Sequence, residues 1–220
     1  MSSENRPTRF LLVDDHMIIR TGLKIVLREE YFASEVDEAE NTSAAKNLLS
    51  ARAYDLLILD INIPDDNIFD FVMYLQAVKP EQKILMFSTN NEELYATKFF
   101  KLGVKGYLSK QAPDSEIKNA VRTVMNGRIY LSEGMQHFMT SKYLTEDSNK
   151  PSNPFDQLTT REFEIVSLIL KGESTKEIGN ILNLQISTVS THKTNIFNKL
   201  NVKNVLQLSE LARLNGVEVC

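Results

Sequence analysis

The sequence contains no tryptophan, and its single cysteine, Cys220, is the last residue. One cysteine cannot form a disulfide within the chain, which excludes a disulfide-stapled secreted domain and fits a reducing cytoplasm. Long apolar runs are also absent: none approaches the roughly 18 residues that a membrane-spanning helix needs. The first ten residues are polar and lack the apolar core of a secretion signal. We therefore expect a cytoplasmic protein that does not contact a membrane.

The net charge of −4 argues against a nucleic-acid partner, but the charges are unevenly distributed. Residues 151–220 hold seven Lys or Arg and seven Asp or Glu, so the first 150 residues carry the whole deficit. No carboxylate occurs between Glu177 and Glu210, a window that contains Lys193 and Lys203. Salt screens charges over about 8 to 10 Å, so this local composition matters more to a nearby phosphate than the total charge.

At 220 residues the chain has room for two modest domains. The first 128 residues alternate strand-like and helix-like patterns, which predicts an α/β doubly wound, flavodoxin-like domain with five parallel strands. The predicted strands are 9–15, 34–40, 54–60, 83–88 and 104–110, and the predicted helices are 16–30, 42–52, 67–78, 92–103 and 113–127.

The remaining residues have a different pattern. Residues 129–156 read as a linker, with a stretch at 129–144 that is compatible with a short helix and a polar, proline-containing end. Residues 157–220 are purely helical in pattern and predict a small all-α domain of four helices with a helix-turn-helix. Two capping boxes, Thr159 with Glu162 and Ser174 with Glu177, predict helix starts, and Ser187 is the predicted N-cap of the third helix.

Polar side chains follow four of the predicted strands. Asp14 and Asp15 end the first strand and Asp60 ends the third, while Ser88 and Lys110 end the fourth and fifth. Ligands of open parallel sheets bind at these carboxyl ends, so we expect the five side chains to converge. Converging carboxylates suit Mg²⁺, a carboxylate there can attack a phosphoryl group, and a hydroxyl and an ammonium can hold its oxygens.

The motifs "LLVDDH", "LLILDINIP", "MFS" and "GVKGYLSK" make residues 8–125 resemble the receiver domain of bacterial two-component response regulators. The resemblance implies that Asp60 is the phosphoacceptor. It also implies that Asp14, Asp15 and Asp60 bind Mg²⁺ together with the backbone carbonyl of Asn62. A sensor histidine kinase would then supply the phosphoryl group.

By the same resemblance, Ser88 and Lys110 bind the phosphoryl group and Tyr107 is the aromatic residue that changes rotamer on activation. Three positions depart from the family pattern. Ile68 replaces a common glycine, Thr89 replaces a smaller residue, and Gln111 follows Lys110 where proline is usual. These departures bear on loop stiffness, phosphoryl access and the geometry after the last strand.

The predicted third helix of the C-terminal domain has one apolar and one polar face. Val189, Ile196 and Leu200 share a face at 3.6 residues per turn and are the expected core. The opposite, carboxylate-free face suits a major groove, with lysines for phosphates. The candidate DNA contacts are Lys176, Ser190, Thr191, His192, Lys193, Thr194 and Lys199.

The elements "LTTREFEIV", "KEIGNIL" and "STVSTH" make residues 157–216 resemble the LuxR-type helix-turn-helix. Together the two resemblances identify the chain as a response regulator of the NarL/FixJ group. They imply that phosphorylation controls homodimerisation and binding to double-stranded DNA. They also imply no enzyme activity beyond Mg²⁺-dependent self-phosphorylation and autodephosphorylation.

Other functions remain compatible with the sequence. A LuxR-type transcription factor could carry a receiver-like domain that dimerises without phosphorylation. A phosphatase of the haloacid dehalogenase type also uses an Asp nucleophile and Mg²⁺, but it expects a second Asp where this chain has Asn62. A scaffold whose C-terminal helices bind protein would be distinguished by the absence of salt-dependent DNA binding.

Overall fold

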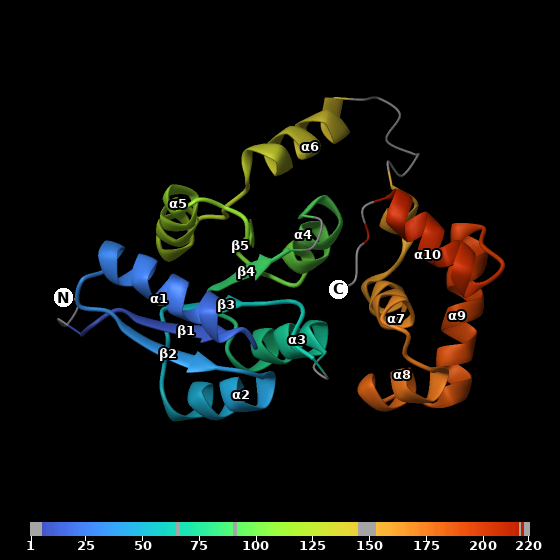
Figure 1. Ribbon diagram of the computed structural model, residues 1–220, viewed down its shortest axis with the longest axis horizontal. Coiled ribbons are helices and arrows are strands. Elements are labelled where there is room, and N and C mark those ends of the chain that lie inside the picture. The colour runs from blue at the N-terminus through green and yellow to red at the C-terminus, as the bar shows by residue number, and fades with distance from the viewer. Residues whose placement is uncertain (1–5, 65–66, 90–91, 145–152, 216, 218–220) are drawn as a thin grey trace. The chain divides into compact units, whose positions relative to one another are not determined.

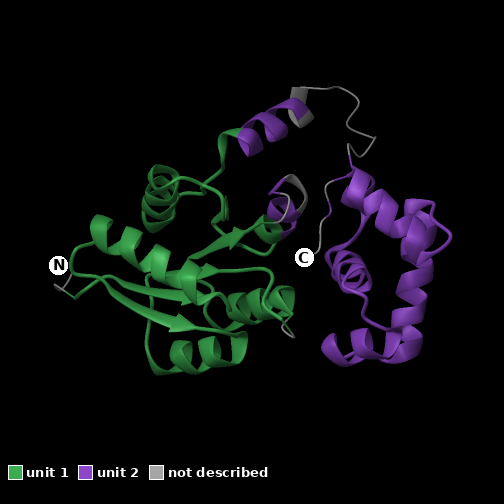
Figure 2. Cartoon of the chain, in the orientation of Figure 1, with its two compact units in different colours: residues 1–89, 99–133 green, residues 90–98, 134–220 purple. Residues whose placement is uncertain are grey.

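The computed structural model of the protein describes residues 6–64, 67–89, 92–144, 153–215 and 217. The chain groups into two compact units, residues 1–89 with 99–133 and residues 90–98 with 134–220 (Figure 2). Residues 145–152 of the predicted linker and Cys220 lie outside the described residues.

A five-stranded parallel sheet forms the centre of the first unit (Figure 1), as the sequence predicts. Its order is β2-β1-β3-β4-β5, so the strand order reverses between β1 and β3 and opens a crevice at their carboxyl ends. The strands are β1 (Arg9–Val13), β2 (Glu35–Ala39), β3 (Leu56–Leu59), β4 (Ile84–Ser88) and β5 (Gly106–Ser109).

Helices cover both faces of this sheet, with α1 and α5 on one face and α2 and α3 on the other (Figure 1). Alternate strand residues such as Leu12 and Ile58 pack in one cluster with Leu27 of α1 and Val124 of α5. The helices that follow these strands are α1 (Met17–Glu30), α2 (Thr42–Ala51), α3 (Ile68–Val78), α4 (Glu92–Lys101) and α5 (Asp114–Met125). The division between the two units falls within α4, after residue 98. Ile68 is buried as the first residue of α3.

The second unit is helical. A Cβ at Gly179 would lie 2.9 Å from the carbonyl oxygen of Leu184, so glycine is what lets α8 pack against the following turn. Asn183 in that turn has a φ of 52°. The helices are α6 (Glu133–Leu144), a 3₁₀ turn at Pro154–Gln157, α7 (Thr160–Leu170), α8 (Thr175–Ile181), α9 (Ile186–Leu200) and α10 (Val205–Leu214). None of the helices in the described ranges is both long and apolar enough to span a membrane.

Two of the three helix caps predicted for the C-terminal domain are confirmed. Both predicted capping boxes are present, at Thr159 and at Ser174. The predicted N-cap Ser187 is wrong, because the backbone N–H of Val189 already donates to the carbonyl of Gln185. Gln185 is therefore the N-cap, α9 begins at Ile186, and Ser187 lies inside the first turn.

Candidate functional site

The carboxyl ends of β1, β3 and β5 bring two carboxylates and one ammonium together. The ladder bonds of the sheet continue to these residues: Asp60 N–H donates to the Val13 carbonyl at 2.8 Å, and Lys110 N–H donates to the Ser88 carbonyl at 2.9 Å. The Lys110 Nζ lies 2.7 Å from Asp14 Oδ2 and 2.9 Å from Asp60 Oδ2. The sheet itself thus fixes the backbone of this cluster, and one lysine links the two acids.

Burial sets the electrostatics of this cluster. The side chains of Asp60 and Asp14 are 0% and 4% exposed. Burial raises the pKa of the Asp60 carboxyl, and the charge of Asp14 adds to this, against the opposing effect of Lys110. Burial alone would lower the pKa of the Lys110 ammonium, but its bonds to Asp14 and Asp60 outweigh burial and raise it. Lys110 is therefore held as a cation.

Some carboxylate oxygens of the cluster have no hydrogen-bond partner. Within the part of the chain that the structure describes, Asp15 Oδ1 and Asp60 Oδ1 are buried and unpartnered. Asp14, Asp15, His16 and Asp60 each offer one ligand atom, and these atoms all lie within 4.8 Å of one another. Unpaired buried carboxylate oxygens are costly without a compensating charge. The arrangement can therefore hold a cation, as the sequence predicts for the three acids, and it includes His16, to which we assigned no role.

A buried arginine supports the acidic end of β1. The guanidinium of Arg20, on α1, donates to the backbone carbonyl of Asp14 at 2.6 Å. It also forms ion pairs with Glu38 at 3.0 Å and Glu40 at 3.1 Å. Its side chain is 6% exposed. The sequence does not predict this role, because one arginine within a helical pattern does not indicate which backbone carbonyl its side chain contacts.

The other predicted members of the site lie nearby in the fold. Asn62 is in the loop after β3, and its backbone N–H bonds to the Asp60 carboxylate. Ser88 is the last residue of β4, and Tyr107 is in the middle of β5; both are completely buried. Leu108 packs in the apolar cluster that includes Leu27 of α1 and Val124 of α5. Successive strand residues point to opposite faces of a sheet, so Tyr107 points to the face covered by α2 and α3.

The polar face of α9 is exposed, as predicted. Val189, Ile196 and Leu200 are buried, whereas Thr191 and Thr194 are exposed on the other side. The hydroxyls of both threonines donate to carbonyls of their own helix, at 3.0 and 3.1 Å, and the exposed Ser190 does the same at 2.9 Å. A hydroxyl held this way still offers its oxygen lone pairs to a ligand.

The basic candidates differ in their surroundings. The Lys193 ammonium lies 5.7 Å from the centroid of the Phe197 ring. Lys176 is exposed in the first turn of α8, and His192 is half-buried. The sequence predicts that Lys199 is solvated and available to contact a phosphate. Instead, its ammonium lies 2.6 Å from Glu162 Oε2.

The Glu162–Lys199 ion pair joins α9 to the start of α7. Burial alone would raise the pKa of the Glu162 carboxyl, but the bonds from Lys199 and Thr159 outweigh it and lower the pKa. Glu162 therefore stays ionised and holds Lys199 at the end of α9. The sequence contains the Thr159–Glu162 capping box, but nothing in it shows the third partner.

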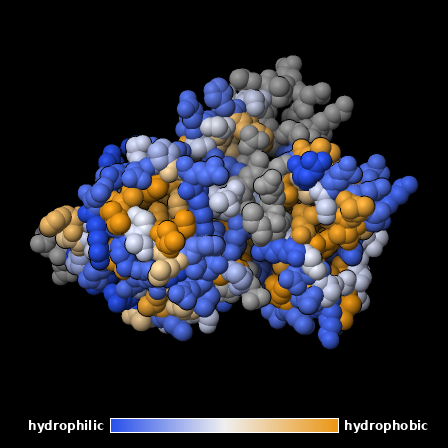
Figure 3. Space-filling view, viewed as in Figure 1, coloured by the Kyte–Doolittle hydropathy of each residue, from blue (hydrophilic) through white to orange (hydrophobic). Residues whose placement is uncertain are grey.

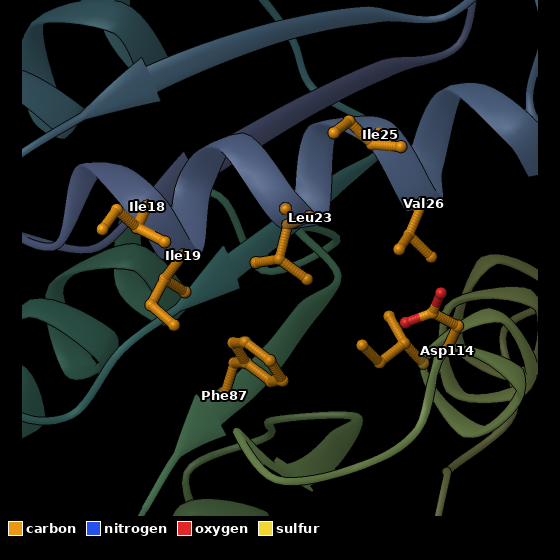
Figure 4. A pocket seen from close by; sticks show the side chains of 9 residues that line it. Ile18, Ile19, Leu23, Ile25, Val26, Phe87 and Asp114 are labelled. Carbon is orange, nitrogen blue, oxygen red and sulfur yellow. The ribbon is translucent and has the colours of Figure 1, made fainter.

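An apolar groove lies beside the start of α1. Met17 and Ile18, directly after the acidic cluster in sequence, are 66% and 80% exposed, and hydrophobic residues gather over α1 on the surface (Figure 3). The groove has a volume of about 310 Å³, and in it Leu23 points from α1 toward Phe87 with Asp114 at the far side (Figure 4). It offers an apolar surface with one carboxylate and no group for chemistry.

Comparisons with protein families match both units. Residues 10–122 match the response regulator receiver domain, and residues 156–212 match the bacterial regulatory proteins of the luxR family.

Similar proteins match over nearly the whole chain. The oxygen regulatory protein NreC of Staphylococcus carnosus is 32% identical over 209 residues, 93% of this chain and 96% of that protein. The response regulator UvrY of Escherichia coli (strain K12) is 30% identical over 207 residues, 94% of each. RcsB from Salmonella enterica serovar Typhimurium, solved bound to the promoter rprA with the phosphomimetic BeF3−, has the same fold. It superposes with a TM-score of 0.77 at 22% identity, over 94% of this chain and 98% of RcsB.

Proposed function

This chain belongs to the response regulators that join a receiver domain to a luxR-family DNA-binding domain, and we propose that phosphorylation of Asp60 is the signal that it passes to DNA. The buried Asp60 carboxylate carries the proposal, with one oxygen on Lys110 and the other without a partner among the described residues. The proposed domains are the receiver at 1–128, the linker at 129–156 and the DNA-binding domain at 157–220.

Mg²⁺ is the proposed cofactor of the receiver. The unpartnered oxygens of Asp15 and Asp60 and the neighbouring Asp14 form an all-oxygen donor set, which suits this hard cation. The backbone carbonyl of Asn62 is the proposed further ligand. When bound, Mg²⁺ neutralises charge on the phosphoryl oxygens.

The proposed phosphodonor is a phosphohistidine of a sensor histidine kinase. Asp60 Oδ1 attacks the phosphorus and forms the O–P bond of an acyl phosphate. The P–N bond breaks, and its electron pair remains on the imidazole nitrogen. The Lys110 ammonium and the Ser88 hydroxyl donate to the phosphoryl oxygens. Water later attacks the same phosphorus, the O–P bond breaks with its electron pair returning to the Asp60 carboxylate, and inorganic phosphate leaves. Between the two steps the chain stores the phosphoryl group as a signal.

The kinase must reach Asp60 through the mouth of the acidic cluster. Met17 and Ile18, the first two residues of α1, follow the acidic cluster directly in sequence and are exposed, and Ile18 lines the apolar groove. We therefore place the kinase contact on this end of the apolar groove. Burial of such side chains contributes to association, and the charged cluster beside them orients the donor.

Phosphorylation is proposed to reposition Ser88 and Tyr107 and so to change the surface of α4, β5 and α5. Homodimerisation would follow, and the dimer would bind two related half-sites on double-stranded DNA. The polar face of α9 is the proposed reader of the major groove, with flanking lysines on phosphates. The proposed contacts are Lys176, Ser190, Thr191, His192, Lys193, Thr194 and Lys199. The proposed location of this function is the cytoplasm, because the chain must reach DNA.

The phosphoryl group should be found on one residue. Purified protein is incubated with Mg²⁺ and acetyl phosphate, and the hydroxylamine-labile label is located by mass spectrometry. We expect one label on the wild type and none on Asp60→Asn. Asp114→Asn is the control, because Asp114 is exposed at the start of α5 and distant in sequence from the acids. Equal labelling of Asp60→Asn would contradict the assignment. Turnover of a phosphate ester would favour a phosphatase.

A further inference from the structure

The side chain of His16 lies on the acidic cluster and does not cap the helix that it precedes. His16 is the N-cap residue of α1, a position whose side chain commonly accepts a backbone N–H, yet it makes no such bond. Its Nδ1 lies 2.8 Å from Asp15 Oδ1 and 3.2 Å from Asp14 Oδ1. The imidazole thus brings one nitrogen to a set of carboxylate oxygens.

These distances match those between ligands that share one metal ion. Two ligands about 2.1 Å from a metal are about 3.0 Å apart at right angles and about 3.4 Å apart at a tetrahedral angle. His16 Nδ1 is hydrogen-bonded to Asp14 Oδ1 at 3.2 Å, within this range, and that oxygen also accepts the His16 backbone N–H at 2.8 Å. The same nitrogen lies 2.8 Å from Asp15 Oδ1, just below the range. Asp15 Oδ1 has no hydrogen-bond partner among the described residues although this nitrogen is 2.8 Å away, so the contact lacks the geometry of a hydrogen bond.

The lysine of the cluster contacts one oxygen of each of two carboxylates. Lys110 Nζ contacts the Oδ2 atoms of Asp14 and Asp60. The Oδ1 atom of Asp60 is buried without a partner among the described residues, on a side chain that is 0% exposed. The His16 imidazole and the three carboxylates each offer one ligand atom, and these atoms all lie within 4.8 Å of one another.

We propose that His16 is a fourth side-chain ligand of this cation site, which makes it a binding site for a divalent transition metal of the zinc class. Imidazole suits zinc, whereas Mg²⁺ takes oxygen ligands, so nitrogen discriminates between the two ions. The inference deepens the proposed function, since it concerns the same acidic cluster. It implies that such a metal competes with Mg²⁺ for the receiver.

The test is a Zn²⁺ titration of the untagged full chain by calorimetry, without a phosphodonor. We expect His16→Asn to weaken Zn²⁺ binding at least about ten-fold, since even changes to residues behind metal ligands have effects of that size. Mg²⁺ affinity should change less than two-fold. Asparagine is a good N-cap, so the variant keeps the start of α1. His137→Asn, an exposed histidine on α6, is the matched control, and Cys220→Ser removes the one thiol.

A second readout identifies the ligand directly. The chain has three histidines, so its ring-nitrogen NMR spectrum contains three sets of signals. Zn²⁺ should shift the Nδ1 signal of His16 first. Equal Zn²⁺ affinity of wild type and His16→Asn, or an unshifted His16 signal at saturation, would overturn the inference. Failure of Asp60 labelling with Mg²⁺ would instead contradict the proposed function. The Zn²⁺ titration uses no phosphodonor, so its result does not depend on that labelling.

Discussion

The acidic cluster of the first unit and the polar face of α9 in the second differ in how much their structure says about function. Asp60 and Asp14 are almost fully buried, and both contact the ammonium of Lys110. Buried charges are costly, so their presence requires a compensating interaction. Thr191 and Thr194 are exposed, and their hydroxyls donate to carbonyls of their own helix. Such bonds are common in solvated helices and do not indicate a ligand. Burial therefore indicates a function for the acidic cluster, whereas the exposed face of α9 provides no such indication.

A second contrast lies in what supports the two regions. Arg20 reaches the Asp14 carbonyl from a buried position, whereas Lys199, which pairs with Glu162, is 38% exposed. Interactions lose strength as water screens them. We therefore expect substitutions around the acidic cluster to have larger effects than matched substitutions around α9.

The largest effect is expected at Lys110. Lys110→Met removes the cation that donates to the phosphoryl oxygens, so labelling by acetyl phosphate should slow about 100-fold. Mg²⁺ affinity should rise at the same time, because the ammonium no longer competes for Asp14 and Asp60. Labelling rates and Mg²⁺ titrations measure the two changes. A fall in both would mean that Lys110 maintains the fold of the site and has no direct role.

A smaller effect is expected at Arg20. Arg20→Met leaves the Asp14 carbonyl and Glu38 without their buried donor and should lower the free energy of unfolding by about 2 kcal/mol. Urea denaturation measures this. Arg52→Met is the control, because Arg52 is 40% exposed and also pairs with β2, at Glu35 and Asp37. Its effect should stay below about 0.5 kcal/mol. Equal losses would remove the contrast between buried and exposed pairs.

The smallest effect is expected between two lysines of α9. Lys193→Ala should weaken DNA binding and reduce the slope of log affinity against log salt by about one. Lys199→Ala should change that slope less, because Glu162 already neutralises its ammonium. Binding to one DNA fragment at several salt concentrations compares the two. A larger slope change for Lys199 would show that this lysine breaks its ion pair with Glu162 when the protein binds DNA.

The fold and the acid–lysine cluster were predictable from the sequence because strand and helix periodicity and strand-end positions are local signals. Asp14, Asp60 and Lys110 converge because parallel strands end at the same edge. The contributions of Arg20 and of the Glu162–Lys199 pair were not predictable, since each depends on a contact between elements distant in sequence. His16 had one signal, its position directly after two aspartates. The Ser187 cap was wrong because the chain offers an earlier start at Gln185.

In the proposed function, phosphorylation in the acidic cluster of the first unit controls DNA binding by the second. The most direct measurement is enrichment of genomic DNA fragments by the full chain, with and without acetyl phosphate and Mg²⁺. Wild type should enrich a specific set of fragments more strongly when phosphorylated, and Asp60→Asn should show no response to the phosphodonor. Identical enrichment by both proteins under both conditions would contradict the claim and would favour a regulator whose receiver dimerises without phosphorylation.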